Sequence, residues 1–289
     1  MALIAVTGSS GFLGGQVVAE LLRRGHRVRG LDATPGRDER PSEFEEHTLD
    51  LRDGEAARQA LTGCDGVVHL AGYPRAGDHS PGEVFDTNTA ITFAVVQAVL
   101  DLQIPALAYV SSVSVLGYPF FTVPITPEYL PLDEGATTTP QDAYGLSKAV
   151  GEQIIQAAVD QAGGGLSAVS LRMPWLQSPA SFWRDIPASA TDGSDADNLF
   201  AYLDTRDAAA AIASVFGREL TGHARVFVAA DDTFSRLPTM ELIQQHFAGV
   251  PVSGPLDGHR SLIDSTAAKE LLGWTPEWSW RSYPEEIVE

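Results

Sequence analysis

The sequence LIAVTGSSGFLGGQVVAELLRRG, residues 3–25, decides the fold of this 289-residue chain. Its first five residues form an apolar run, which is typical of a strand buried in a parallel sheet. The glycine-rich stretch 7–14 follows directly, and apolar residues at helical spacing then continue until Gly25. A strand, a glycine turn and a helix in this order predict a dinucleotide-binding unit, because glycines let the backbone approach a pyrophosphate at the helix N-terminus.

Strands and helices alternate along the rest of the chain. We expect further strands at 28–32, 46–51, 67–71, 106–111, 168–173 and 224–229. We expect helices up to about 61 (capped by Asp53) and at 83–102, 144–162, 206–216, 239–247 and 265–272. This alternation predicts a parallel sheet covered on both faces through right-handed crossovers. The predicted fold class is therefore α/β, a Rossmann-type doubly wound sheet.

Two segments interrupt this alternation. Residues 117–143 contain five prolines and four aromatic residues, and residues 178–198 are similarly irregular. Long loops inside compact domains are usually functional, so both are expected walls of a substrate site. We expect a dinucleotide-binding domain at 1–174 and mainly a small substrate-binding lobe at 175–289, with about 202–230 returning to the core.

Composition narrows the class of partner. The 38 acidic and 19 basic residues give a net charge of −19, which disfavours binding to nucleic acid or to an anionic membrane. The single cysteine, Cys64, fits a reducing compartment, and the N-terminus lacks the basic region of a signal peptide. The seven histidines are scattered and no H-E-x-x-H motif occurs, so we expect no metal site, and we expect His223, His246 and His259 at the surface. These features favour a cytoplasmic protein with a small-molecule substrate.

The expected cofactor site begins in the glycine-rich turn. Its predicted cofactor-binding residues are Gly8, Ser10, Gly11, Phe12, Leu13 and Gly14. Asp32 ends the second strand, 18 residues after Gly14, where a carboxylate accepts hydrogen bonds from a ribose 2′-hydroxyl and repels a 2′-phosphate. The sequence therefore favours NAD. NADP stays an alternative because Arg37 and Arg40 lie nearby in sequence and could offset the carboxylate.

The candidate catalytic residues lie in two places. Tyr144 and Lys148 are four residues apart, which places both on one helix face, and an ammonium beside a phenol favours the phenolate. Ser112 and Ser114 follow the fifth strand, at the edge where open parallel sheets bind ligands. Either serine could instead only cap the turn. Asn88 has two interpretations, as a residue that orients Lys148 through a bridging group or as an ordinary buried amide.

Together these motifs resemble those of extended short-chain dehydrogenases/reductases, which include nucleotide-sugar epimerases and sugar dehydrogenases. The resemblance covers nearly the whole chain, at residues 7–14, 50–51, 69–72, 111–112, 117, 144–148, 171–174, 202–207 and 271–276. It implies that Tyr144 is the acid/base, that Lys148 holds the nicotinamide ribose and that Ser112 binds the reacting oxygen. It places further residues beside the cofactor, namely Asp50, Leu51, Leu70, Ala71, Gly72 and Pro174, with His69 structural or on the cofactor side. We expect Tyr73 and Trp175 beside the substrate with Ser112 and Ser114.

Departures from the family narrow the substrate class. Dehydratases of the family carry an Asp-Glu pair where Val113 and Ser114 stand, so dehydration is disfavoured. Only 27 residues separate Pro174 from Tyr202, which leaves little chain to enclose a nucleotide diphosphate. This short connection resembles that of uronate dehydrogenases. Those enzymes bind the carboxylate of their substrate with an arginine, and Asp197 stands at the matching position here. A uronate substrate is therefore disfavoured. A neutral sugar, a polyol or another small ketone is preferred.

The leading functional hypothesis is an NAD-dependent oxidoreductase that moves a hydride between nicotinamide and a secondary alcohol or ketone. The alternatives are a nucleotide-sugar epimerase with retained NAD and a non-catalytic dinucleotide sensor. The helices around 83–102 and 142–162 are apolar nearly all round, which requires a second covering surface. We expect a homodimer built from these two helices. The alternative is that the C-terminal lobe or the proline-rich loop covers them within one chain.

Overall fold

The computed structural model describes residues 1–36, 41–75, 79–186, 191–194 and 196–284. Its centre is a seven-stranded sheet in the order β3–β2–β1–β4–β5–β6–β9, in which every pairing is parallel. Its strands are β1 (Leu3–Thr7), β2 (Arg27–Asp32), β3 (Phe44–Thr48), β4 (Gly66–His69), β5 (Ala106–Ser112), β6 (Ser167–Met173) and β9 (His223–Phe227). A separate two-stranded sheet pairs β7 (Trp175–Gln177) with β8 (Tyr202–Asp204). The predicted α/β doubly wound class is confirmed.

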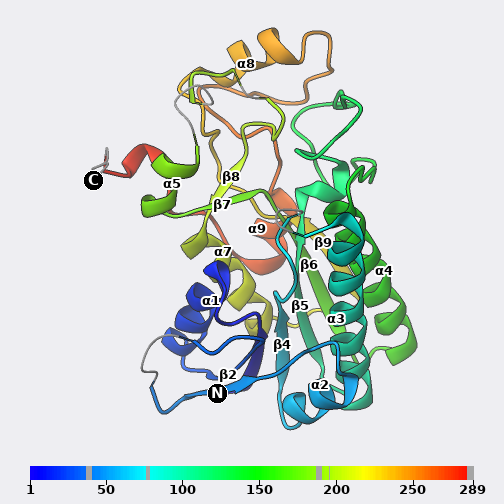
Figure 1. The fold of residues 1–289 in the computed structure, drawn as a ribbon. Helices are drawn as coiled ribbons and strands as arrows, with labels where there is room; N and C mark the ends of the chain where they lie inside the picture. The colour runs from blue at the N-terminus through cyan, green and yellow to red at the C-terminus, as the bar shows by residue number, and fades with distance from the viewer. Residues whose placement is uncertain (37–40, 76–78, 187–190, 195, 285–289) are drawn as a thin grey trace.

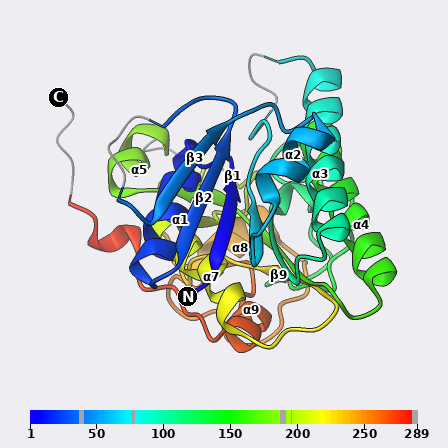
Figure 2. The ribbon, with the colours of Figure 1, turned by 90° about the horizontal axis from the view of Figure 1, so that it is seen from below.

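Helices cover both faces of the large sheet (Figures 1 and 2). The α-helices that the structure describes are α1 (Phe12–Arg23), α2 (Gly54–Leu61), α3 (Pro81–Asp101), α4 (Ala143–Ala162), α5 (Pro179–Asp185), α7 (Thr205–Ser214), α8 (Thr239–His246) and α9 (Thr266–Leu272). Helices α1, α7 and α9 lie on one face, and α2, α3 and α4 lie on the other. The carboxyl ends of the strands therefore open between these two layers, under the lobe that carries α5 and α8 (Figure 1).

Three local expectations differ from the structure. Strand β3 begins at Phe44, whose buried ring belongs to the core, and ends at Thr48 rather than at residue 51. Strand β4 ends at His69 because the next two backbone N–H groups turn and donate to the Thr7 hydroxyl, both at 3.1 Å. The segment 178–198, expected to be irregular, contains α5, which Ser178 starts through a capping box with Ser181.

Apolar packing divides the molecule into a central sheet region and a lobe. The two faces of the sheet bury residues such as Val17 and Ile212 on one side and Val99 and Ile155 on the other. The lobe has its own cluster, which includes Phe182, Phe200, Phe234, Leu242 and Trp280. This cluster also takes residues from the proline-rich segment, including Leu130 and Leu132. The lobe is therefore built from both sides of residue 174.

His69 joins the central strands to α3 through a chain of hydroxyl groups. Its Nδ1 lies 2.8 Å from the Thr7 hydroxyl, which already accepts two backbone N–H groups and therefore donates to the ring. Its Nε2 lies 3.1 Å from the Thr92 hydroxyl, which itself donates to the backbone of Asn88. Nδ1 is therefore the unprotonated nitrogen, and burial lowers the pKa of His69 to about 3.

We expect the protein to lose stability as the pH falls below about 6.5, the usual pKa of histidine in an unfolded chain. The unfolded state takes up a proton there, whereas folded His69, with a pKa of about 3, does not. This group alone should cost about 2 kcal/mol between pH 6.5 and pH 5. Urea unfolding at several pH values measures the loss, and His69→Gln should show a shallower dependence. An identical dependence in both proteins would contradict this account.

Candidate active site

The glycine-rich turn is shaped by close contacts between backbone atoms. Gly8 has a φ of +72°, and Gly11 precedes α1 as its N-cap without any side-chain cap. A β-carbon at Gly14 would lie 2.0 Å from the carbonyl oxygen of Gly8, so only glycine fits there. The uncapped start of α1 leaves its first N–H groups available for an anionic group. Phe12 is 58% exposed beside this turn, and Leu13 is buried.

Asp32 closes the turn from the neighbouring strand. One carboxylate oxygen accepts from the backbone N–H of Ser10 and the other from that of Thr34, both at 3.0 Å. A carboxylate oxygen accepts more than one hydrogen bond, so these contacts leave it able to bind a hydroxyl as well. Asp32 therefore lies where the sequence predicts a ribose-binding residue. Arg37 and Arg40 lie outside the described residues.

The other predicted cofactor residues lie at the same edge of the sheet. Asp50 is exposed and paired with Arg52 at 2.6 Å, and Leu51 is buried. The backbone N–H groups of Leu70 and Ala71 bond to the Thr7 hydroxyl, so they are fixed beside the glycine turn. Two more predicted residues, Gly72 and Pro174, follow β4 and β6, where these strands end.

Tyr144 and Lys148 lie together on α4, as their spacing predicts. The Lys148 ammonium donates to the carbonyl oxygen of Val110 at 2.8 Å and lies 5.6 Å from the centre of the Tyr144 ring. Burial lowers the pKa of Lys148 to about 8, and the nearby carboxylate of Glu152 opposes this shift. The lysine is thus fixed between β5 and the phenol.

The expected lowering of the phenol pKa is not found. Burial raises the pKa of Tyr144 to about 12, which outweighs the lowering effect of the neighbouring Ser112 hydroxyl. The carboxylate of Asp142, the N-cap of α4, raises this pKa further. The residues of the chain alone therefore hold Tyr144 in its protonated form, ready to donate a proton.

Ser112 caps the turn that follows β5, and its hydroxyl contacts that of Ser114. The Ser112 hydroxyl donates to the Ser114 hydroxyl at 3.0 Å and accepts from the Ser114 backbone N–H at 3.1 Å. Both side chains are buried at the end of β5. The capping role and the position next to Tyr144 therefore coexist.

Asn88 links the loop after β4 to α4 and does not reach Lys148. Its amide oxygen accepts from the backbone N–H of Tyr73 at 2.7 Å. Its amide nitrogen donates to the Tyr73 carbonyl and to the Ser147 hydroxyl, both at 3.1 Å. Both amide hydrogens are thus engaged, one of them by Ser147, which directly precedes Lys148 on α4. These bonds connect α3, the loop after β4 and α4.

One aromatic side chain contacts Tyr144, and two others stand at the remaining positions where the sequence predicts substrate contacts. Phe120, from the proline-rich segment, is 41% exposed and meets the Tyr144 ring edge-on at 6.3 Å. Trp175 begins β7 and is 38% exposed, and Tyr73 stacks on His79. Gln177 is fully buried at the end of β7, and its amide nitrogen has no hydrogen-bond partner in the described part of the chain.

Sequence reasoning missed an ion-pair network behind the catalytic candidates. Arg172 on β6 bonds both oxygens of Glu152 on α4, at 2.9 and 2.7 Å, and both side chains are buried. The hydroxyl of Ser111 donates to the same carboxylate at 2.7 Å. An arginine inside an apolar strand was the available signal, because a buried charge needs a partner. Its partner, however, lies 20 residues away in sequence.

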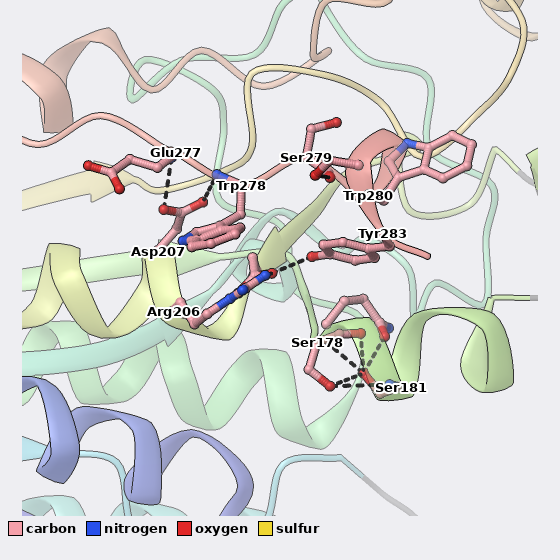
Figure 3. Close-up of polar contacts among 12 residues, drawn as sticks. Ser178, Ser181, Arg206, Asp207, Glu277, Trp278, Ser279, Trp280 and Tyr283 are labelled. Carbon is pink, nitrogen blue, oxygen red and sulfur yellow. Dashed lines mark hydrogen bonds and ion pairs between the residues drawn. The ribbon is translucent and has the colours of Figure 1, made fainter. Parts of the chain in front are cut away.

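A second missed cluster fixes the C-terminal segment on α7 (Figure 3). The Asp207 carboxylate accepts from the backbone N–H groups of Glu277 and Trp278, both at 2.9 Å, and burial raises its pKa to about 6. The Arg206 guanidinium lies 3.4 Å from the centre of the Trp278 ring. Tyr283 donates to Asp204, which also pairs with Arg206. The segment therefore depends on the sequence stretch 202–207.

Three further features concern His223, metal binding and membrane crossing. His223, expected at the surface, is half-buried: it bonds the Ser170 hydroxyl at 2.8 Å, and burial lowers its pKa to about 4. Within the described ranges, no group of three or more histidine, cysteine, aspartate or glutamate residues could hold a metal ion. None of the described helices combines the length and the apolar character that a membrane crossing needs.

Comparison with known proteins identifies similar chains. The model of the NAD-dependent epimerase/dehydratase family matches residues 4–223. An L-arabinose 1-dehydrogenase (NAD(P)(+)) of Haloferax volcanii is 33% identical over 181 residues, which cover 61% of this chain and 68% of that enzyme. A UDP-glucose 4-epimerase of Streptomyces lividans is 30% identical over 173 residues, which cover 57% of this chain and only half of that enzyme.

Among solved structures, a short-chain dehydrogenase/reductase superfamily protein from Agrobacterium tumefaciens, crystallised with NAD, superimposes with a TM-score of 0.73. The two chains are 24% identical, and the match covers 96% of this chain and 94% of the other. The superposition spans both the sheet and the lobe, so the two proteins share the same overall fold.

Proposed function

Because the chain belongs to the NAD-dependent epimerase/dehydratase family, we propose that it is an NAD-dependent dehydrogenase or reductase of a small sugar-like substrate. The observation that carries this proposal is the arrangement of Ser112, Tyr144 and Lys148 at the carboxyl edge of the sheet. A sensor without catalysis needs neither a tyrosine at this edge of the sheet nor a lysine fixed beside it. The non-catalytic alternative is therefore disfavoured.

The residues at the edge of the sheet fit NAD. The turn at Gly8 and Gly14 is too tight for side chains, and the uncapped start of α1 suits a pyrophosphate. Asp32 suits a ribose hydroxyl at the end of β2. When bound, NAD supplies the nicotinamide carbon that accepts or gives the hydride.

Each catalytic candidate has a separate task in this proposal. Tyr144 exchanges a proton with the substrate oxygen while the attached carbon loses or gains the hydride. After Tyr144 has given its proton to the substrate oxygen, the positive charge of Lys148 stabilises the phenolate that remains. The Ser112 hydroxyl, which now donates to Ser114, turns to donate to the substrate oxygen. Asn88 keeps α4 and the Tyr73 loop in place.

The substrate class follows from the size and character of the site. The short connection between β6 and β8 supports a small neutral sugar or polyol over a nucleotide sugar, and the similarity to an L-arabinose 1-dehydrogenase supports the same class. An epimerase with retained NAD is the second candidate, supported by the similarity to UDP-glucose 4-epimerases. The purified protein distinguishes them. NAD that exchanges freely on dialysis supports the dehydrogenase, and NAD that stays bound supports the epimerase.

We propose that the cofactor binds to residues 1–174 and the substrate mainly to residues 175–289, while the proline-rich segment 117–143 contributes to the apolar cluster of the lobe. Support comes from the separate apolar cluster of the lobe and from α7 and β9, which pack on the central sheet. A cytoplasmic location is part of the same proposal, since the single cysteine, Cys64, is free and buried.

We expect the enzyme to prefer NAD over NADP, because the Asp32 carboxylate would meet the 2′-phosphate of NADP. A preference of about tenfold or more in kcat/KM corresponds to roughly 1.4 kcal/mol. The Asp32→Ser variant should narrow this preference, since it removes the negative charge but keeps a short polar side chain. A clear NADP preference of the unmodified enzyme would show that Arg37 or Arg40 overrides the carboxylate.

We also expect a homodimer through α3 and α4. Much of their apolar surface is buried by their packing on each other and on the sheet, but Phe93 stays 58% exposed and Leu146 44% exposed. Burial of these side chains against a second copy would remove them from water. Light scattering should give twice the 30.8 kDa of one chain, and Phe93→Glu should lower that mass. A monomer mass for the unmodified protein at micromolar concentration contradicts the dimer.

A further inference from the structure

A cavity of about 360 Å³ lies between α4, β6 and β9. Its lining residues are Thr138, Ala149, Val150, Glu152, Gln153, Arg172 and Arg225. None of the proposed catalytic residues is among them. The cavity is therefore a space separate from the proposed catalytic residues, on the face of the sheet that carries α4.

The charges in this cavity do not balance. Two guanidinium groups, those of Arg172 and Arg225, face one carboxylate, that of Glu152. Arg172 uses its Nε and one terminal nitrogen in two short bonds to that carboxylate. Ser111 occupies a further acceptor position of the same group. One positive charge is left over among the lining residues.

Arg225 carries this surplus charge in an accessible position. Its side chain is 28% exposed, and its Nε lies 3.3 Å from Glu152, a longer contact than either bond of Arg172. Its other contact, to the Gln156 amide oxygen, is 3.4 Å long. A guanidinium has five N–H donors, so Arg225 has donors to offer to a ligand. The lining residues Thr138 and Gln153 add neutral polar groups.

We propose that this cavity binds a small oxyanion, a carboxylate or a phosphate group, with Arg225 as its main ligand and Arg172 beside it. The planar fork of a guanidinium matches two oxygens of either group. The net charge of −19 repels anions from most of the surface, so a locally positive cavity concentrates them at one place.

The position of the cavity connects it to the catalytic residues. Glu152 lies one helical turn after Lys148 on α4, and Ser111 directly precedes Ser112 on β5. An oxyanion that draws Arg225 away from Glu152 leaves this carboxylate to Arg172 and Ser111. Binding then adds contacts between α4, β6 and β9 and stabilises the folded state.

Calorimetric titration with malonate and with inorganic phosphate tests the proposal, with saturating NAD to occupy the glycine-rich turn and with the ionic strength kept constant with sodium chloride. We expect saturable binding of at least one of them, with one site per chain. The Arg225→Gln variant should bind about tenfold to hundredfold more weakly, because it loses a charge-assisted pair of hydrogen bonds. Tighter binding of malonate identifies a carboxylate as the ligand group, and tighter binding of phosphate identifies a phosphate ester.

Arg58→Gln is the matched control, because it makes the same charge change on an exposed arginine of α2. It should bind as the unmodified protein does. Circular dichroism checks that both variants are folded. The absence of saturable binding for both anions, or equal binding by folded Arg225→Gln, would overturn the proposal. The titration needs no substrate, so its outcome is independent of the proposed dehydrogenase activity.

Discussion

The Tyr144→Phe variant is expected to lose turnover by about 100- to 10,000-fold, the usual contribution of general acid–base catalysis. The substitution removes only the hydroxyl that exchanges a proton with the substrate oxygen. The ring keeps its edge-on contact with Phe120 and its position beside Lys148. NAD affinity should therefore stay close to that of the unmodified enzyme.

Steady-state kinetics and calorimetric titration with NAD measure these two properties separately. Tyr129→Phe is the matched control, since it removes a hydroxyl that bonds Asp133 on the surface of the proline-rich segment. It should keep nearly full turnover. Near-normal turnover in Tyr144→Phe would refute the assignment of Tyr144 as the acid/base.

The Gly14→Ala variant is expected to lose most of its NAD affinity. The added methyl group would lie 2.0 Å from the Gly8 carbonyl oxygen, so the backbone of the turn must move. That turn holds the proposed pyrophosphate site, and a displacement of its backbone removes hydrogen-bond donors from the ligand. Overpacking of this kind costs roughly 1–3 kcal/mol, which corresponds to about tenfold to hundredfold in affinity.

Gly15→Ala provides a close control for this substitution. A β-carbon at Gly15 meets no atom within 4 Å, and the residue lies inside α1. Alanine is favoured over glycine in a helix, so this variant should bind NAD normally and be slightly more stable. Unchanged NAD affinity in Gly14→Ala would show that the glycine turn does not form the cofactor site.

Local signals in the sequence were enough to predict the sheet and most of its helices. The apolar run of β1, the glycine turn and the capping residue Asp53 are each defined by neighbouring residues, and the structure confirms them. The pairing of Tyr144 with Lys148 depends only on helical spacing and is confirmed in the same way. Patterns of this kind need no knowledge of distant segments.

Features that depend on distant segments could not be predicted in the same way. The pair of Arg172 and Glu152 joins β6 to α4, and the bonds from Asp207 reach residues 70 positions later in the chain. The raised pKa of Tyr144 depends on how deeply the fold buries it, which residue spacing does not show. The half-burial of His223 could not be predicted for the same reason, because its partner Ser170 lies on a neighbouring strand.

The most direct test of the central claim is to incubate the purified protein with NAD and each member of a panel of neutral sugars and polyols. The absorbance of NADH is then measured. The account predicts that one class of small sugar gives steady accumulation of NADH over many turnovers per chain. It also predicts that Tyr144→Phe lowers the rate of NADH accumulation by about 100- to 10,000-fold. The account is contradicted if no substrate yields free NADH while tightly held NAD supports interconversion of UDP-sugars, since that result identifies an epimerase.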